Sequence, residues 1–384
     1  MKITQLFRDF SDSEKSGGIT LIVCTIISIV LANTAFGDSY THFWHSTLGE
    51  QSVEYWINDG LMTIFFLLIG LELEREIYIG ELSNIKDALL PIFGALGGMI
   101  IPAGIYVWLN FGTTTQSGAG IPMATDIAFA LGILSLLGKK VPTSLKVFLT
   151  ALAVIDDLGA IMVIAIFYTK AIIWLNLFIA MGIFVFLIIL NRLKIRNLIP
   201  YLIGGVVMWY FMLNSGIHAT ITGVLLAFAI PFGNGDEKST SYILQHFLHK
   251  PVAFLVLPLF ALANTAIVIN TDLGEIITQK FSLGISLGLI IGKPIGIVLI
   301  SFLAVSFGIC KLPDDLNWKS ITGVGFLGGI GFTMSIFITL LAFDDFELQN
   351  DSKITILIAS VIAAIIGFIS LYFSLKKQPK YNLD

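Results

Sequence analysis

Long apolar stretches recur along the whole chain, and they constrain its fold more than any other feature of the sequence. A membrane-spanning helix needs about 20 predominantly apolar residues. Hydrophobic residues make up 56% of the 384 residues and charged residues only 12%, with a mean hydropathy of +0.90. A soluble domain cannot hide so much apolar surface. The sequence therefore predicts an all-α polytopic membrane protein.

Twelve apolar windows qualify as transmembrane helices. No linker suggests a second domain, so residues 1–384 are expected to form one membrane domain. Residues 1–18 are too polar for a cleavable signal peptide, so the first window is expected to be retained. The windows lie at 17–35, 57–73, 88–109, 121–138, 147–169, 171–190, 198–212, 216–231, 251–270, 281–309, 320–342 and 354–375.

Lysine and arginine are distributed unevenly between the two sides of the membrane in this predicted topology. Placing both termini in the cytoplasm puts 18 of the 22 basic residues on the cytoplasmic side, which satisfies the positive-inside rule. Lys170, Lys280 and Lys353 fall on the outer side, and Lys293 lies inside a window. The net charge of −4 is small and no basic patch indicates nucleic-acid binding, so the expected environment is the lipid bilayer.

Two adjacent acids, Asp156 and Asp157, interrupt the apolar run from Val147 to Tyr168. They lie near the middle of that run, so both carboxylates are expected close to the midplane of the bilayer. An ionised acid there costs about 3 kcal/mol on insertion scales, and two neighbouring acids also repel each other. Nothing structural requires this arrangement. The pair is therefore a functional-site hypothesis.

Windows 121–138 and 320–342 contain residues that break helices. The first holds Thr125 and Asp126 directly after a Gly- and Pro-rich stretch, and glycines crowd the second. Such glycines also permit close helix packing, which is the alternative interpretation. Close packing does not account for Asp126, a third acid beside the predicted break. The breakers are Gly118, Gly120, Pro122, Gly323, Gly325, Gly328, Gly329 and Gly331.

Short motifs suggest that units 88–169 and 281–375 are copies of each other. Pro102-Ala-Gly104-Ile105 matches Pro294-Ile-Gly296-Ile297, while Thr125 and Phe129 match Thr333 and Phe337. In the predicted topology the two units cross the membrane in opposite directions, so the repeat would be inverted. Inverted repeats with interrupted helices form midplane substrate sites in many secondary transporters.

Asp126, Asp156, Asp157 and Lys293 are four ionisable residues expected inside the membrane. A structural ion pair with Lys293 would account for one or two acids and leave at least one unbalanced. Carboxylate and hydroxyl oxygens suit hard cations such as Na⁺ or Li⁺. Thr125 and Asp126 are expected to contribute oxygens beside Asp157. No cofactor is expected. A buried carboxylate can hold either H⁺ or Na⁺, and competition between them is itself an exchange mechanism.

The two adjacent acids are expected to have different roles. On an ideal helix they point about 100° apart, so they face different partners. We expect Asp157 to be the main Na⁺ ligand and Asp156 to be the proton-coupled partner of Lys293. Half-helix ends carry partial charges, so Asp126 is expected to compensate N-termini and Lys293 to compensate C-termini.

The sequence resembles the NhaA family of sodium/proton antiporters, themselves established examples of inverted-repeat transporters. The resemblance implies twelve helices, two inverted units and crossed discontinuous helices 4 and 11. It implies ion and proton binding at Asp156 and Asp157, compensation by Asp126 and Lys293, and electrogenic exchange that expels Na⁺ across a bacterial inner membrane. It rests on ATDIAFALG (124–132), AVIDDLGAI (153–161), IGKPIGI (291–297), GIGFTMSIFI (329–338), FFLLIGLELERE (65–76) and SGIHAT (215–220).

Two departures from the family pattern concern regulation and assembly. The resemblance implies pH-responsive residues at Glu72, Arg75, Glu76, His246 and His249, but Gln245 stands where an acid is often found and Glu74 where a basic residue often stands. Relatives can dimerise through a β-hairpin in the first outer loop. Residues 37–58 look too short and too poor in alternating β-branched residues for a good hairpin, so a homodimer is less strongly predicted.

Three other functions are weighed against antiport. A Na⁺- or H⁺-coupled symporter of an organic solute would need a roomier polar cavity than these windows suggest. An intramembrane aspartyl protease needs acids from separate helices around a water, and Asp126 with Asp157 could form such a dyad. Neither acid belongs to a Gly-x-Gly-Asp segment, because Gly233-Asn234-Gly235-Asp236 lies in a polar connection outside the windows. A channel is less compatible with buried carboxylates that bind tightly. The sequence therefore favours a transporter and not an enzyme.

Overall fold

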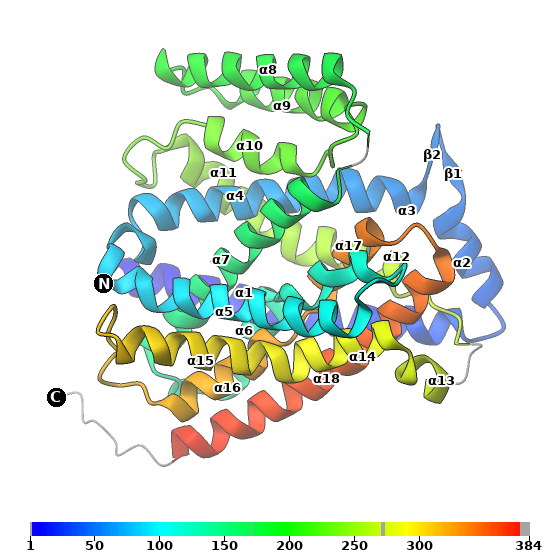
Figure 1. Cartoon of the computed structure of the whole chain (residues 1–384). Coiled ribbons are helices and arrows are strands. Elements are labelled where there is room, and N and C mark those ends of the chain that lie inside the picture. Colours follow the sequence, from blue (N-terminus) through cyan, green and yellow to red (C-terminus); the bar gives the residue numbers. More distant parts are fainter. Residues whose placement is uncertain (1, 170, 270–272, 377–384) are drawn as a thin grey trace. The chain divides into compact units, whose positions relative to one another are not determined.

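The computed structural model describes residues 2–169, 171–269 and 273–376, and these residues are mostly helical (Figure 1). Lys170, Lys377 and Lys380, which the charge analysis used, lie outside the described residues. The chain divides into two compact units that are described separately. The first contains Met1–Ile19, Ile85–Ala160 and Asn270–Asp384, and the second contains Thr20–Asn84 and Ile161–Ile269.

The first unit is a bundle of long helices and two interrupted segments. It includes the start of α1 (Lys2–Ala32) and most of α7 (Thr143–Phe167), both of which continue into the second unit. Its other elements are α5 (Ile85–Asn110), η3 (Gln116–Met123), α6 (Ile127–Leu136), η4 (Gly138–Lys140), α13 (Leu273–Thr278), α14 (Lys280–Leu287), η6 (Gly288–Gly292), α15 (Lys293–Ser306), α16 (Trp318–Gly328), α17 (Phe332–Ala342) and α18 (Phe346–Lys376).

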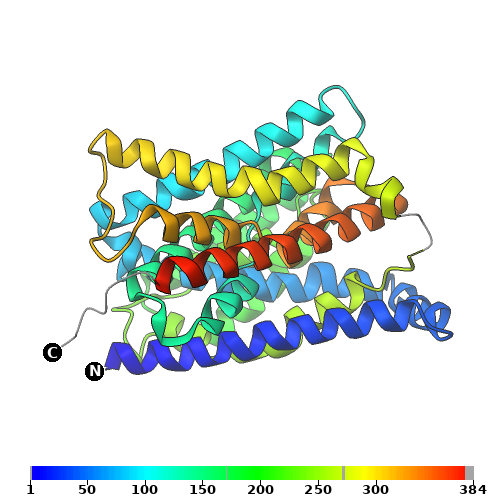
Figure 2. The same ribbon diagram turned by 90° about the horizontal axis from the view of Figure 1, so that it is seen from below.

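Glycines allow α5 and α15 to pack with their backbones in contact. A Cβ atom on Gly97 would lie 2.0 Å from Gly296 O, and one on Gly296 would lie 2.1 Å from Gly97 O. Figure 1 shows the two helices side by side, and in Figure 2, seen from below, α15 (yellow) passes in front of α5 (cyan). Close approach at small residues is the usual way membrane helices gain packing energy. Gly104, which the repeat motif matched to Gly296, meets nothing within 4 Å.

Both segments that were expected to be interrupted contain non-helical residues. Residues 124–126 separate η3 from α6, and residues 329–331 separate α16 from α17, which are bent by 46°. The two breaks are joined by a backbone hydrogen bond, in which Asp126 N donates to Ile330 O at 2.7 Å. Each break thus satisfies part of the other's backbone hydrogen bonding.

The second unit packs its glycines in the same way. Gly223 of α10 (Ile221–Ala229) lies against α4 (Met62–Tyr78), where an added Cβ would meet Thr63 O at 2.3 Å, and Gly70 of α4 lies against Ala227. Its further elements are α2 (Gly37–His45), β1 (Thr47–Leu48), β2 (Gln51–Ser52), α3 (Val53–Tyr55), η1 (Trp56–Leu61), α4 (Met62–Tyr78), η2 (Glu81–Ser83), α8 (Trp174–Arg192), α9 (Leu198–Leu213), α10 (Ile221–Ala229), α11 (Thr240–Pro251), η5 (Val252–Val256) and α12 (Leu257–Asn264).

The expectation that residues 37–58 could not form a good hairpin was wrong. Thr47 pairs with Ser52 and Leu48 with Gln51 in a short antiparallel ladder. Gly49 supplies the turn with a φ of +73°, a conformation that glycine adopts without steric cost. A hairpin with two-residue strands depends on turn chemistry and needs no long alternating pattern, which is why the alternation criterion missed it.

By length and composition, the described residues contain eight helices able to cross a membrane, or up to ten if each bent pair counts as one span. The short windows at 198–212 and 216–231 form α9 and α10, with 16 and 9 residues. The window predicted at 251–270 starts earlier, because one helical segment runs from Thr240 to Asn264. The chain is therefore a multi-pass membrane protein, and the number twelve stays a prediction.

Replacing Gly97 by valine is expected to lower the melting temperature of the detergent-purified protein. The new side chain would overlap Gly296 O, and overpacking of this kind costs about 1–3 kcal/mol. Gly104→Ala on the same helix is the matched control, since a Cβ there meets nothing within 4 Å. Equal melting temperatures for Gly97→Val and the unchanged protein would contradict the close α5–α15 contact.

Candidate ion-binding site

Asp126 caps two helices that begin at the two breaks. Its Oδ1 accepts a hydrogen bond from Phe129 N at 2.9 Å, at the start of α6. Its Oδ2 accepts from Thr333 N at 3.1 Å and from Thr333 Oγ1 at 2.5 Å, at the start of α17. The residue is only 2% exposed. One buried carboxylate therefore faces the positive ends of both half-helices, where negative charge is favoured.

Lys293 lies at the C-terminal end of a helical segment, where positive charge is favoured. Its Nζ donates to Met123 O, the last residue of η3. The same ammonium contacts Asp156 Oδ2 at 2.5 Å, and the side chains of both residues are completely buried. An ammonium group has three protons to donate, so it can serve the carbonyl and the carboxylate together. Lys293 thereby connects the break before α6 to α7.

Thr125 adds a hydroxyl group to the same carboxylate. Its Oγ1 lies 2.6 Å from Asp156 Oδ2 and 2.8 Å from Gly328 O, the last residue of α16. A hydroxyl has one proton, so it donates to one of these oxygens at a time. Its oxygen is then available as an acceptor or as a cation ligand. Thr125 is fully buried.

The two adjacent acids on α7 lie in different environments. Asp156 Oδ2 receives Lys293 and Thr125, whereas within the described residues no hydrogen bond reaches Asp156 Oδ1. Asp157 is buried to the same extent, at 1% exposure. Nearby, Gly159 makes room for Met99, whose Sδ would lie 2.1 Å from an added Cβ. The arrangement offers carboxylate oxygens to a cation in a site closed to bulk water.

The structure thus brings Thr125, Asp126, Asp156 and Lys293 into one hydrogen-bonded region, with Asp157 next to it. No group of three or more His, Cys, Asp or Glu side chains in the described residues converges as a metal cluster. Thr333 belongs to this region, although the sequence analysis used it only as a repeat match. The backbone oxygens of Met123 and Gly328 were not foreseen, because any residue type supplies a carbonyl.

The residues implied in the pH response all lie in the second unit, where Glu72 interacts electrostatically with Arg75 and Glu76, and His249 with His246. His249 Nδ1 lies 4.0 Å from Glu72 Oε1, and both side chains are largely buried. Glu76 Oε2 instead accepts from Glu81 N at 2.9 Å. His246 is exposed and its ring stacks on Tyr242 at 6.1 Å between centroids. The Glu72–His249 pair has the geometry of an interacting acid and base.

The two residues that depart from the family pattern are both buried. Glu74 is 4% exposed and accepts a hydrogen bond from Ser241 Oγ at 3.3 Å, which joins α4 to α11. Gln245 is 9% exposed on the same face of α11, one turn after Ser241. Position 245, where the family resemblance favours an acid, thus carries an amide, while an acid on α4 faces the same helix.

Replacing Lys293 by methionine is expected to destabilise the protein, because Asp156 is left buried without its ammonium partner. Removing one partner of a buried pair costs about 3–5 kcal/mol. The double variant Lys293→Met with Asp156→Asn removes the uncompensated charge and should recover most of the loss. Thermal unfolding in detergent measures the stability of both variants. If Lys293→Met is as stable as the unchanged protein, Lys293 does not stabilise buried Asp156.

Comparison with known proteins gives matches along nearly the whole chain. Residues 8–371 match the family described as Na⁺/H⁺ antiporter 1. The Na⁺/H⁺ antiporter NhaA of Flavobacterium psychrophilum is 75% identical over 98% of this chain and 98% of its own length. NhaA 1 of Flavobacterium johnsoniae is 66% identical over 98% of both chains. NhaA of Cytophaga hutchinsonii is 62% identical over 98% of this chain and 97% of its own.

Proposed function

The chain belongs to the Na⁺/H⁺ antiporter family that matches it from residue 8 to 371, and we propose that it expels Na⁺ in electrogenic exchange for H⁺ by alternating access. The relatives named as NhaA Na⁺/H⁺ antiporters cover almost all of both chains. The chain is a Na⁺/H⁺ antiporter, a transporter and not an enzyme. A symporter of organic solutes, the alternative considered from sequence, is not supported.

The observation that carries the mechanism is the buried Asp156–Lys293 contact beside Asp157. A cation that enters the site is drawn to Asp157 and to Asp156 Oδ1, and Thr125 Oγ1 offers a neutral oxygen. Its charge competes with the Lys293 ammonium for Asp156. When the carboxylates take up protons instead, they lose the charge that holds Na⁺. Na⁺ and H⁺ therefore exclude each other, which couples their movements.

Electrogenic exchange requires more than one proton for each Na⁺. Two proton-binding groups are available in the proposed scheme: the carboxylate of Asp157 and the Asp156–Lys293 pair. If both release a proton when Na⁺ binds, each cycle moves net charge across the membrane. Li⁺ is proposed as a second substrate, because the same hard oxygen ligands accept it. These ions are cargo and not resident cofactors.

Alternating access is proposed to use the interrupted helices as a crossed pair within two inverted units, 88–169 and 281–375. The hydrogen bond from Asp126 N to Ile330 O supports contact between the two breaks. Asp126 at two helix N-termini and Lys293 at the end of η3 support the proposed dipole compensation. With these charges in place, the broken ends can stay buried while the surrounding helices move.

The proposed setting is a bacterial inner membrane, with twelve spans and both termini in the cytoplasm. The support is the asymmetric distribution of lysine and arginine and the positive-inside rule. A pH response is proposed for Glu72, Arg75, Glu76, His246 and His249, with the Glu72–His249 contact as its best-supported element. A titrating histidine next to an acid is a common pH-sensitive device.

Asp157→Asn is expected to abolish Na⁺-driven proton movement in proteoliposomes, since an amide cannot exchange a proton for a cation. Na⁺ is added outside vesicles that contain a pH-sensitive dye, and a potential-sensitive dye reports net charge movement. Glu237→Gln, at an exposed acid in a connection, is the matched control and should behave like the unchanged protein. Full exchange by the Asp157→Asn variant would contradict the role of Asp157 in ion binding. Exchange by the unchanged protein without net charge movement would contradict electrogenic exchange.

We also propose a homodimer held by the hairpin, whose exposed Leu48 and short strands offer an edge to a second copy. Gly49→Val should weaken the dimer, because a β-branched residue is strained at a φ of +73°. Gly112→Val makes the same change at a φ of +72° in another turn and serves as the control. Light scattering in detergent measures the mass, and an unaffected dimer in Gly49→Val would argue against hairpin assembly.

A further inference from the structure

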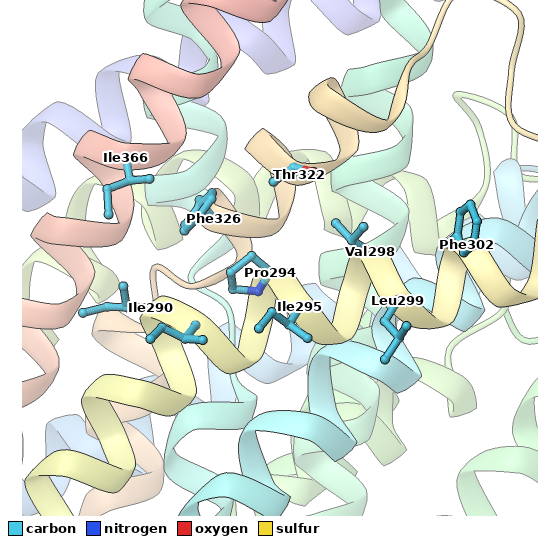
Figure 3. A pocket seen from close by; sticks show the side chains of 10 residues that line it. Ile290, Pro294, Ile295, Val298, Leu299, Phe302, Thr322, Phe326 and Ile366 are labelled. Atoms are coloured by element: carbon cyan, nitrogen blue, oxygen red, sulfur yellow. The ribbon is translucent and has the colours of Figure 1, made fainter.

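An apolar groove lies between α15, α16 and α18 of the first unit, with a volume of about 580 Å³ (Figure 3). Pro294, Val298 and Phe302 form one wall, on α15, and Phe326 and Ile366 face them from α16 and α18. Phe302 is 48% exposed, and Ile295, two turns earlier on the same helix, is 50% exposed. Exposed apolar side chains on a membrane-spanning helix face lipid, so the groove opens toward acyl chains.

A second, more polar hollow of about 720 Å³ adjoins the groove at the start of α16. Asn317, Trp318, Lys319 and Ser374 line it, and Thr322 lines both hollows. The Trp318 ring also meets Phe302 of the groove edge-to-face, at 5.3 Å between centroids. The two hollows therefore share a border, and together they form one site with a polar end and an apolar end.

The polar end has the chemistry of an anion site. Lys319 is exposed there. Asn317 Oδ1 accepts from Ser320 N at 2.9 Å and from Ser374 Oγ at 3.3 Å, which leaves its Nδ2 on the other side of the amide to donate. The N-terminus of α16 adds the partial positive charge of a helix end. Two exposed acids, Asp314 and Asp315, precede α16, but neither lines the hollow, and Asp315 Oδ2 accepts a hydrogen bond from Ser144 Oγ.

We propose that the two hollows bind one anionic phospholipid, with its phosphate at Lys319 and Asn317 and one acyl chain along the groove. The helix from Ile290 to Phe302 is about 18 Å long. The hydrocarbon layer of one leaflet is about 15 Å thick, so the two lengths are similar. The polar end lies where Trp318 marks a membrane interface, a position that tryptophan favours. A lysine at this end selects a net negative headgroup over a zwitterionic one.

The occupied groove would lie directly behind the ion site. Pro294 follows Lys293 in the chain, and Phe326 lies just before Gly328, whose carbonyl contacts Thr125. The acyl chain would thus contact the same two helices that carry these groups. Neither Lys319 nor the residues of the groove wall belong to the proposed ion site, so lipid binding can be altered separately from ion binding.

Native mass spectrometry of delipidated protein, reloaded with phosphatidylglycerol or phosphatidylcholine, tests the site. Lys319→Gln should weaken binding of phosphatidylglycerol about fivefold, the value of one basic residue near an anionic lipid, and leave phosphatidylcholine unchanged. Val298→Trp, which fills the groove, should weaken both. Lys250→Gln, at an exposed lysine of the second unit, and Ile100→Trp, at a residue of α5 that is 64% exposed, are matched controls and should bind like the unchanged protein.

Three outcomes would overturn the proposal. Equal affinity for the two lipids would exclude a headgroup site at Lys319. Undiminished binding in Val298→Trp would place the lipid elsewhere. A Val298→Trp variant that loses its dimer in lipid-free detergent would show that a second copy of the chain occupies the groove. Because the readout is binding, failure of this proposal would be distinguishable from failure of the exchange mechanism.

Discussion

Backbone groups released at a helix break must be satisfied inside the membrane, where no water is available to replace their partners. Two breaks meet in this protein, so several helix ends are buried together. Asp126 accepts from the first turns of α6 and α17, and Lys293 donates to the end of η3. The hydrogen bond between Asp126 N and Ile330 O links the breaks themselves. The rest of the site depends on this compensation.

This constraint explains why the site contains three acids and one lysine. Asp126 and Lys293 are held by the backbone, so neither is available to act only as a ligand. Lys293 is shared with Asp156, which leaves the region with more carboxylates than ammonium groups. Such a region is stable only if a proton or another cation balances the excess, because an unpaired buried charge is costly. Exchange of H⁺ for Na⁺ follows naturally from this imbalance.

The sequence was most informative where a residue type is costly in a membrane. Asp126, Asp156, Asp157 and Lys293 could be singled out because charge in an apolar window needs a reason, and the structure places them close together. The carbonyls of Met123 and Gly328 leave no trace in a sequence, so they could not be predicted. The Asp156–Lys293 partnership could only be suggested, since helix rotation does not define contacts across a bundle.

Close contacts and turns were less predictable, for different physical reasons. Gly104 was matched to Gly296 by motif, yet it is Gly97 that touches Gly296, because contact depends on where two helices cross and not on local composition. The hairpin was missed because a two-residue ladder depends on one glycine at positive φ, which a search for alternation ignores. Among the pH-response residues, side-chain direction on α11 leaves His246 exposed, while His249 lies 4.0 Å from Glu72, and the sequence does not distinguish the two.

The groove and the ion site share α15 and α16, which gives lipid a physical route to the transport cycle. Thr322 and Phe326 line the groove, and Gly328 at the end of the same helix contacts Thr125. Any movement of α16 that breaks this contact would also change the distance from Phe326 to Pro294. A bound acyl chain fills that space and resists its collapse, because packed interiors have little room to deform. A lipid can bias the exchange cycle only if it binds one state of α16 better than another. In the proposed lipid site, a movement of α16 would change the affinity for the acyl chain, without any direct contact between the lipid and the ion.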